Sequence, residues 1–177
     1  MTEVRTAHTA ELDTGVLDAA RALLQNVFEG DWTDDDWDHS LGGMHVMVWE
    51  GAEIVGHAAV IQRRLLHGGR ALRTGYVEGV AVRADRQRQG HGSAIMSAVE
   101  GVIRRAYALG ALSSSDAAHG LYAGRGWRCW EGPSFRLTPQ GVERTPDEDG
   151  GLYVLPVTAS LDVTGEITCD WRDGETW

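Results

Sequence analysis

The chain has 177 residues and a formal net charge of −10, with 26 acidic side chains against 16 lysine or arginine positions, all of them arginine. This length suits one compact domain, which we expect over residues 1–177. An acidic chain repels nucleic acid, no apolar run is long enough to span a bilayer, and the first residues lack a signal-peptide pattern. We therefore expect a cytoplasmic protein with no nucleic-acid and no membrane partner.

The first part of the chain alternates between strand and helix patterns. Val4–Ala10 alternates in polarity and predicts a strand, while apolar residues at helical spacing predict a helix over Leu12–Phe28. Residues 29–38 hold six acids and two tryptophans, and we expect a charged loop there. A hairpin that turns near Gly51 is predicted over residues 44–66.

The second part predicts a strand, two helices and closing strands. Ser115 and Gly126 are the expected caps of the second helix. The full order is mixed α/β, a mostly antiparallel sheet with helices on both faces. The expected elements are a strand over 71–83, a helix over Ala94–Leu109, a short strand or loop over 110–115, a helix over Asp116–Arg125, strands over 126–130, Ser134–Leu137 and 152–157, and a loop over 139–151.

Two glycines precede the first of these helices. Gly90 and Gly92 would let an anion approach the unpaired N–H groups of a helix N-terminus, and Arg83, Arg86 and Arg88 would add positive charge. A tight turn without a ligand explains the glycines equally well. A Walker loop is excluded because the chain has no lysine, and a dinucleotide fingerprint would need a third glycine and an earlier position in the chain.

A third pattern fits this segment. Residues 87–92 (QRQGHG) match Gln/Arg-x-x-Gly-x-Gly/Ala, the phosphate loop of the GNAT superfamily of acyl-coenzyme A N-acyltransferases, and residues 121–127 (LYAGRGW) resemble a later helix of that family. Together with DWTDDDWDHSLGGMH, GHAAVIQRRL, RTPDEDG and the terminal CDWRDGETW, they resemble the aminoglycoside 2′-N-acetyltransferases over nearly the whole chain. The resemblance implies a GNAT acyltransferase fold, a homodimer, and acetyl-coenzyme A (acetyl-CoA) as the cosubstrate.

The resemblance also implies which residues bind the coenzyme. The backbone of Val80 and Val82 would pair with the pantetheine arm, and one of these N–H groups would polarise the thioester oxygen. The pyrophosphate would lie on the loop and the first helical turn, formed by Gln87, Arg88, Gln89, Gly90, Gly92 and Ser93.

Three residues would carry the proton transfers. Alternation places Glu78 on one strand face with Tyr76, Val80 and Val82, and the resemblance makes it the base that takes the amine proton. Tyr122 would protonate the departing thiolate. Trp177 would fix a terminal carboxylate that could share the base role, so both candidates for the base stay open.

The remaining candidates would hold a cationic substrate. Carboxylates suit a molecule that carries several ammonium groups, and the backbone of Gly79, the Ser113 hydroxyl and Trp177 would add contacts. Aspartate is usual in the family where this chain has glutamate at 148 and 175. The acids are Asp31, Asp36, Glu148 and Glu175.

We expect no metal site, because His39, His45 and His57 lack ligand spacing and Cys129 and Cys169 match no zinc pattern. The leading function is acetylation of the 2′-amine of an aminoglycoside, which confers resistance. The alternatives are another amino sugar or a polyamine as acceptor, or a non-catalytic module that binds acyl-CoA or the drug.

Overall fold

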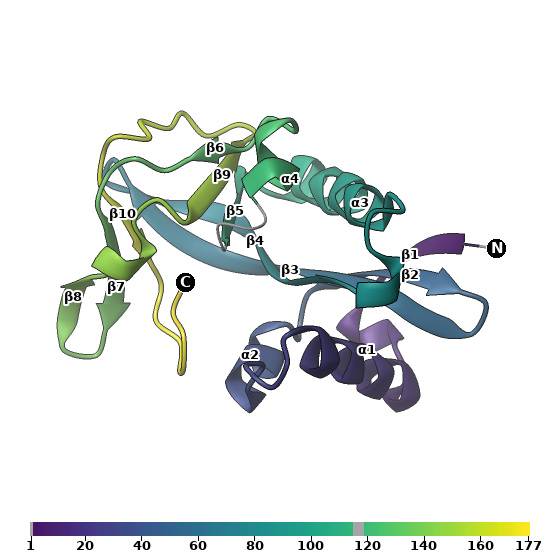
Figure 1. Ribbon diagram of the computed structural model, residues 1–177. Helices are drawn as coiled ribbons and strands as arrows, with labels where there is room; N and C mark the ends of the chain where they lie inside the picture. The colour runs from purple at the N-terminus through teal and green to yellow at the C-terminus, as the bar shows by residue number, and fades with distance from the viewer. Residues whose placement is uncertain (1, 115–118) are drawn as a thin grey trace. The chain divides into compact units, whose positions relative to one another are not determined.

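The computed structural model describes residues 2–114 and 119–177 of the chain (Figure 1). The chain divides into two compact units. The first unit comprises Met1–Ile61 and Val77–Val102, and the second comprises Gln62–Tyr76 and Ile103–Trp177. The single domain expected over the chain stays a prediction.

In the first unit, an antiparallel sheet has helices on both faces. Strand β2 (Met44–Glu50) pairs with β1 (Thr2–His8) and with β3 (Glu53–His67), as the alternation and the hairpin predicted. Helix α1 (Thr14–Val27) packs on one face, where its buried residues meet Met47 and Ile54. Helix α3 (His91–Ala106) packs on the other face, on the opposite side of β2 and β3 from α1 (Figure 1).

Two boundaries of this unit differ from the expectation. The acidic segment is not all loop, because α2 (Asp34–His39) forms inside it. The Thr33 hydroxyl accepts from the Asp36 N–H while the Asp36 carboxylate accepts from the Thr33 N–H, a reciprocal cap that starts the helix. The acids of the first turn add to it, because negative charge is favourable at a helix N-terminus. Helix α3 begins at His91, three residues before the predicted start, because the Gly90 oxygen already accepts from the Ala94 N–H.

The hairpin of β2 and β3 contains one extra residue. The pairing shifts register between Val48 and Trp49, and Val55 is the residue of β3 without an opposite partner. Its oxygen instead accepts from the Arg83 N–H at 2.9 Å. Beyond a bulge of this kind, each side chain of the strand lies on the opposite face of the sheet from the one that it would occupy without the extra residue.

The second unit is also built on strands. Their order is β6-β9-β5-β4-β3-β10-β7-β8. The β4–β5 and β10–β7 pairs are parallel, whereas β3–β10, β5–β9, β6–β9 and β7–β8 are antiparallel, which confirms the mixed, mostly antiparallel sheet. The bounds are β4 (Arg70–Val82), β5 (Leu109–Ser113), β6 (Arg128–Cys129), β7 (Ser134–Thr138), β8 (Gly141–Arg144), β9 (Leu152–Pro156) and β10 (Ile167–Cys169).

The second half also departs from prediction in three places. The expected helix to Leu109 ends at Ala106, because Leu109 opens β5. The expected loop over 139–151 contains β8, which pairs with β7 as a hairpin, and the 3-10 turn η4 (Pro146–Glu148). Strand β10 has no counterpart in the prediction. The other 3-10 turns are η1 (Thr9–Glu11) and η2 (Ala84–Arg86).

Helix α4 (His119–Ala123) lies within the predicted second helix. The expected cap at Ser115 and start at Asp116 lie outside the described residues. Among the residues described, no helix combines the length and the apolar composition needed to cross a bilayer.

The contact of α1 with the sheet predicts a stability effect. Leu23 is 7% exposed and packs in the cluster with Met47 and Ile54. Leu23→Ala should lower the free energy of unfolding by about 2–5 kcal/mol, because the truncation leaves a cavity in a packed interior. Gln25→Ala, at an exposed position of the same helix, is the control and should change it by less than about 0.5 kcal/mol. Equal losses in a denaturant titration would contradict this packing.

Candidate functional site

The glycine-rich loop of the first unit leads directly into α3. Arg88 (φ 60°) and Gly90 (φ 88°) both have left-handed backbone, and residues 87–90 are exposed. The first N–H groups of a helix have no partner within it and carry its positive dipole end. Helix α3 has 16 residues and is long enough for its dipole to matter. Because its N-terminal N–H groups follow an exposed loop, this segment is a candidate anion site of the kind a pyrophosphate occupies.

The two glutamines of the loop hold its shape. Gln87 Nε2 donates to the Val82 oxygen at 3.2 Å, and Gln89 Nε2 donates to the Asp85 oxygen at 3.3 Å. Their amides brace the loop against the end of β4 and against η2. A ligand of this loop would then meet mainly backbone N–H groups and the Arg88 side chain.

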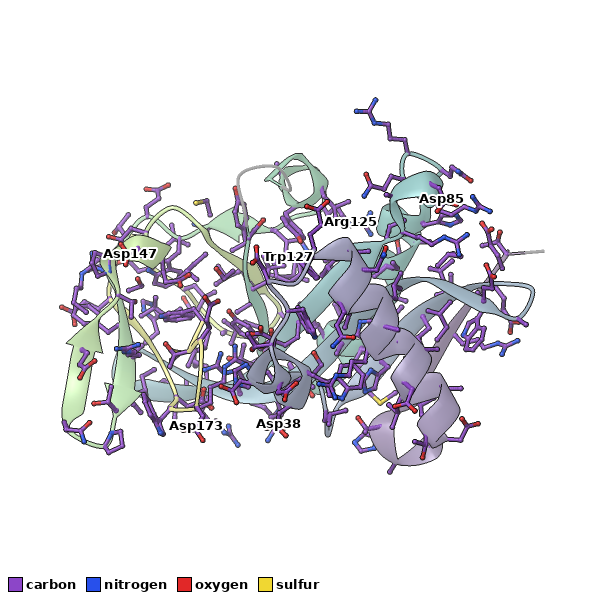
Figure 2. The ribbon with its side chains drawn as sticks, turned by 60° about the horizontal axis from the view of Figure 1, so that its bottom comes forward. Asp38, Asp85, Arg125, Trp127, Asp147 and Asp173 are labelled. Atoms are coloured by element: carbon purple, nitrogen blue, oxygen red, sulfur yellow. The ribbon has the colours of Figure 1, made fainter. Side chains whose placement is uncertain are left out.

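Two of the arginines expected to add charge are already paired. Arg83 donates to Asp85 at 2.7 Å and to Glu53 at 2.9 Å, and Arg86 donates to Asp85 at 2.8 Å and to Glu50 at 2.8 Å. These hydrogen bonds lower the pKa of Asp85 and of Glu50. Figure 2 shows Asp85 at this turn. Arg83 and Arg86, two of the three arginines expected to add positive charge, therefore have that charge largely balanced by neighbouring carboxylates.

Strand β4 is irregular at Gly79, in the middle of the candidate residues. Gly79 has a φ of 55°, which interrupts the alternation that placed Glu78 on one face with Val80 and Val82. A Cβ at Gly79 would lie 3.1 Å from the Trp32 ring and 3.2 Å from Leu24, so a side chain would force these neighbours to shift slightly and would also strain the left-handed backbone. Glu78, Val80 and Val82 are all half-buried.

The acidic segment is anchored on this part of β4. Trp32 contacts Gly79 and stacks on Phe28, with ring centroids 5.0 Å apart and planes at 21°. Asp31 beside it is exposed and can meet a cation from solvent. Asp36 is half-buried, and its carboxylate already accepts two hydrogen bonds from Thr33. Asp36 thus caps α2 in addition to any contact with substrate.

In the second unit, the structure brings three of the predicted substrate residues together. Ser113, at the end of β5, donates to the Glu148 carboxylate at 2.8 Å. Burial raises the pKa of Glu148, the Ser113 hydrogen bond lowers it, and the charges of Glu175 and Asp147 raise it further. Figure 2 shows Asp147 on η4. Neighbouring carboxylates that repel one another in this way form a site that a cation would stabilise.

Trp177 is anchored as the sequence predicted. Its side chain is 6% exposed and belongs to the core of the second unit with Tyr76 and Leu65. The indole N–H donates to the Thr145 hydroxyl at 3.1 Å. Arg172 donates to the Trp177 oxygen at 3.4 Å and to the Glu175 oxygen at 2.9 Å. These contacts fix the main chain of the segment that contains both residues.

Tyr122 lies in the interior of the second unit. It is 4% exposed and meets the rings of Trp127 and Tyr153 at centroid distances of 6.0 Å and 5.6 Å. Burial raises its pKa, although a hydrogen bond with Ser114 opposes the shift. Tyr122 therefore holds its proton at neutral pH, as a general acid must.

Trp32 and His57 were not among the predicted site residues, although both contact Gly79. The tryptophans among the acids were the available signal for Trp32, because exposed acidic loops are usually poor in aromatic residues. Among the residues described, no three or more His, Cys, Asp or Glu side chains are grouped to hold a metal ion.

Comparison with known proteins decides the family. Residues 16–127 match the model of the acetyltransferase (GNAT) family. An aminoglycoside 2′-N-acetyltransferase of Mycolicibacterium fortuitum is 54% identical over 177 residues, which cover 98% of this chain and 91% of the relative. The chain belongs to the GNAT family, and within it to the aminoglycoside 2′-N-acetyltransferases.

Solved structures agree on the fold. Escherichia coli ElaA has a TM-score of 0.63 at 18% identity, and the alignment covers 88% of this chain and 99% of ElaA. The ribosomal-protein-S18-alanine N-acetyltransferase of Escherichia coli has a TM-score of 0.62 at 20% identity, with 92% and 97% covered. Eis1 of Mycobacterium abscessus has a TM-score of 0.61 at 17% identity; 76% of this chain aligns, and it spans 33% of Eis1.

GNAT membership makes the exposed loop the candidate site for the family's cosubstrate. Enzymes of this family use acetyl-CoA, and the loop at residues 87–93 matches their phosphate-binding sequence. Its backbone geometry fits that group, because left-handed residues at 88 and 90 lead directly into the first turn of α3. The acyltransferase assignment thus agrees with the predicted GNAT fold and coenzyme.

The loop predicts a charge-sensitive coenzyme site. Gly90→Asp should raise the Kd for acetyl-CoA about tenfold or more, since like charges brought together cost more than about 1.4 kcal/mol. A Cβ at Gly90 meets nothing within 4 Å, so the variant should fold. Gly90→Ala carries the same backbone strain without the charge, and it separates the two effects in calorimetry. If the two variants bind alike, the anion site is elsewhere.

The Glu148 cluster predicts pH-dependent substrate binding. A bound ammonium group needs the ionised carboxylate, so the aminoglycoside KM should rise as pH falls through the raised pKa of Glu148. Glu148→Gln should raise the aminoglycoside KM about fivefold at neutral pH, corresponding to about 1 kcal/mol. The variant should also lose the rise in KM at low pH. Because a raised pKa means that ionisation opposes folding, the variant should not lose stability at neutral pH.

Asp147→Asn removes an exposed neighbouring charge and is the matched control, with a smaller rise in KM. A KM of Glu148→Gln that keeps the wild-type pH dependence would remove Glu148 from the binding site.

Proposed function

We propose that this GNAT protein transfers the acetyl group of acetyl-CoA to the 2′-amino group of an aminoglycoside antibiotic and so confers resistance. The observation that carries the proposal is the 54% identity, over nearly the full chain, to an aminoglycoside 2′-N-acetyltransferase. The carboxylates of both units support it, because an aminoglycoside carries several ammonium groups.

Acetyl-CoA supplies the acetyl group as a reactive thioester. The amine nitrogen attacks the thioester carbonyl carbon, so a C–N bond forms and the C–S bond breaks. One proton must leave the amine, and one must reach the coenzyme sulfur. Negative charge develops on the carbonyl oxygen in the transition state, where a backbone N–H is an effective stabiliser.

Each step has a candidate in the chain. We assign the amine proton to Glu78 and the proton for the thiolate to Tyr122, whose buried hydroxyl remains protonated at neutral pH. The Val80 N–H is the donor to the thioester oxygen, and the backbone of Val82 pairs with the pantetheine arm. The loop from Gln87 through Gly92 to Ser93 receives the pyrophosphate.

The residues that we assign to substrate binding are Asp31, Asp36, the Gly79 backbone, Ser113, Glu148, Glu175 and Trp177. The carboxylates bind ammonium groups and the neutral groups bind hydroxyls. We also propose that the protein acts as a cytoplasmic homodimer without nucleic acid or membrane, which light scattering and cell fractionation would check.

The deciding experiment measures thiol release from acetyl-CoA with and without aminoglycoside. Release that requires the drug, with a product acetylated at the 2′-amine, is the expected result. Release with other amino sugars or polyamines alone would favour a different acceptor. Binding of acetyl-CoA without release for any amine would favour a non-catalytic module.

Glu78 should be required for proton removal. Glu78→Gln should lower kcat/KM by about 10²–10⁴-fold and remove the acidic limb of its pH profile, because the amide cannot accept the proton. Glu53→Gln changes a largely exposed acid on β3 and serves as the control. A wild-type pH–rate profile in Glu78→Gln would assign the base elsewhere, and Trp177 is the alternative: a C-terminal extension would then abolish turnover while an N-terminal one would not.

A further inference from the structure

A line of hydrogen bonds crosses the interior of the first unit and ends on the main chain of β4. Thr9 Oγ1 lies 2.9 Å from His45 Nε2, and His45 Nδ1 lies 3.0 Å from His57 Nε2. His57 Nδ1 in turn lies 3.0 Å from the Gly79 oxygen. Both imidazoles are fully buried, and none of the roles assigned above uses them.

The direction of each hydrogen bond follows from the last acceptor. A carbonyl oxygen only accepts, so His57 must carry its proton on Nδ1 and leave Nε2 bare. His45 must then donate from its own Nδ1, which leaves its Nε2 to accept from the Thr9 hydroxyl. The Gly42 N–H donates to that hydroxyl at 2.9 Å, and the Gly43 oxygen lies 3.3 Å from it as a second acceptor. Because a neutral His45 that donates from Nδ1 has a bare Nε2, the order places the hydroxyl proton on this nitrogen at 2.9 Å and not on the more distant carbonyl.

Both histidines stay neutral at physiological pH, which this order requires. Burial lowers the pKa of His45 and of His57 to about 4 in each case. His8 is the ionisable neighbour that lowers the pKa of His45 further, and His45 has the same effect on His57. The Trp37 ring of α2 lies 6.4 Å from the His45 ring and brings no charge.

The bond to Gly79 acts on the next residue as well. A peptide group is planar and trans, so the Gly79 carbonyl and the Val80 N–H belong to one rigid plane and point in opposite directions. A donor that fixes the carbonyl therefore fixes the direction of that N–H. It also polarises the peptide, and hydrogen bonds in such chains strengthen one another.

This peptide needs an external restraint. Gly79 has left-handed backbone with a φ of 55°, and glycine can leave that region without steric cost. Leu24 and Trp32 press on its Cα side, whereas His57 holds its oxygen. The imidazole is thus the polar contact that sets the orientation of the peptide plane.

We propose that His57, with its tautomer fixed by His45 and Thr9, is a positioning residue that orients and polarises the Gly79–Val80 peptide, so that the Val80 N–H is aimed at the thioester oxygen of acetyl-CoA. The inference rests on the proposed function for its chemical consequence. Its structural content, the tautomers and the restrained peptide, does not depend on turnover.

The first test needs no variant. Nitrogen-15 NMR of the ¹⁵N-labelled wild-type protein should show both His45 and His57 protonated on Nδ1 and bare on Nε2 at neutral pH. Protonation of either ring on Nε2 would break the order of donors and overturn the proposal. This result holds whichever acceptor amine the enzyme uses.

The second test compares two substitutions at one position. His57→Phe keeps a ring but has no donor, and His57→Asn places an amide N–H near the former Nδ1. The Phe variant should lower kcat about tenfold, less than the ~10²–10³-fold loss on removing an oxyanion donor outright, while the KM for acetyl-CoA changes little. The Asn variant should recover most of kcat.

The Val80 amide reports on the peptide directly. Loss of the hydrogen bond to the preceding carbonyl should move its ¹⁵N resonance upfield in His57→Phe, and His57→Asn should restore it. Wild-type kcat in the Phe variant would overturn the proposal, as would equal losses in both variants at matched melting temperature. If the wild type shows no aminoglycoside-dependent thiol release, the proposed function fails. The tautomers of His45 and His57 and the ¹⁵N shift of Val80 would still test whether His57 orients the peptide.

Discussion

The left-handed backbone of Gly79 is the constraint on which the placement of the first unit's candidate residues depends. In a regular strand the side chains of Glu78 and Val80 would lie on the same face. The left-handed Gly79 between them interrupts this alternation. Gly79 takes part in both packing and hydrogen bonding, because Trp32 packs close to its Cα and His57 bonds to its oxygen. The acidic segment, the buried histidines and the predicted coenzyme-binding backbone are therefore linked through one residue without a side chain.

Much of the fold could be predicted from local patterns. Hydrophobic periodicity predicted the hairpin, helix α1 and the strand before the loop of residues 87–93, because each of these elements buries one face. The register of the hairpin was not readable. A regular two-residue turn would place His45 and His57 on opposite faces, and only the extra residue at Val55 puts them on the same face. The unpaired Val55 oxygen accepts from the N–H of Arg83, the residue after β4, and this partner lies outside the hairpin's own sequence.

The candidate site was predictable to a similar degree. A short motif identified the loop of residues 87–93, since its glycines and its place before a helix are local features. The cluster of Ser113 with Glu148 required the family resemblance, because 35 residues separate the two side chains in the chain. The expected loop around Glu148 folds as β8 and η4 because Phe135 and Arg136 supply backbone partners for residues 143 and 144, which no pattern within the loop indicates.

The ion pairs around Asp85 affect which kinds of anion the neighbouring loop of residues 87–90 can bind. One carboxylate takes hydrogen bonds from two guanidinium groups, and Glu50 and Glu53 take the others. The loop therefore offers a shaped set of N–H groups instead of an open field of positive charge. Long polyanions bind by the number of free cations they meet, whereas a pyrophosphate can be recognised by backbone that fits it. Because Arg83 and Arg86 are held in ion pairs, this loop suits a small anion that fits its backbone better than it suits a long polyanion.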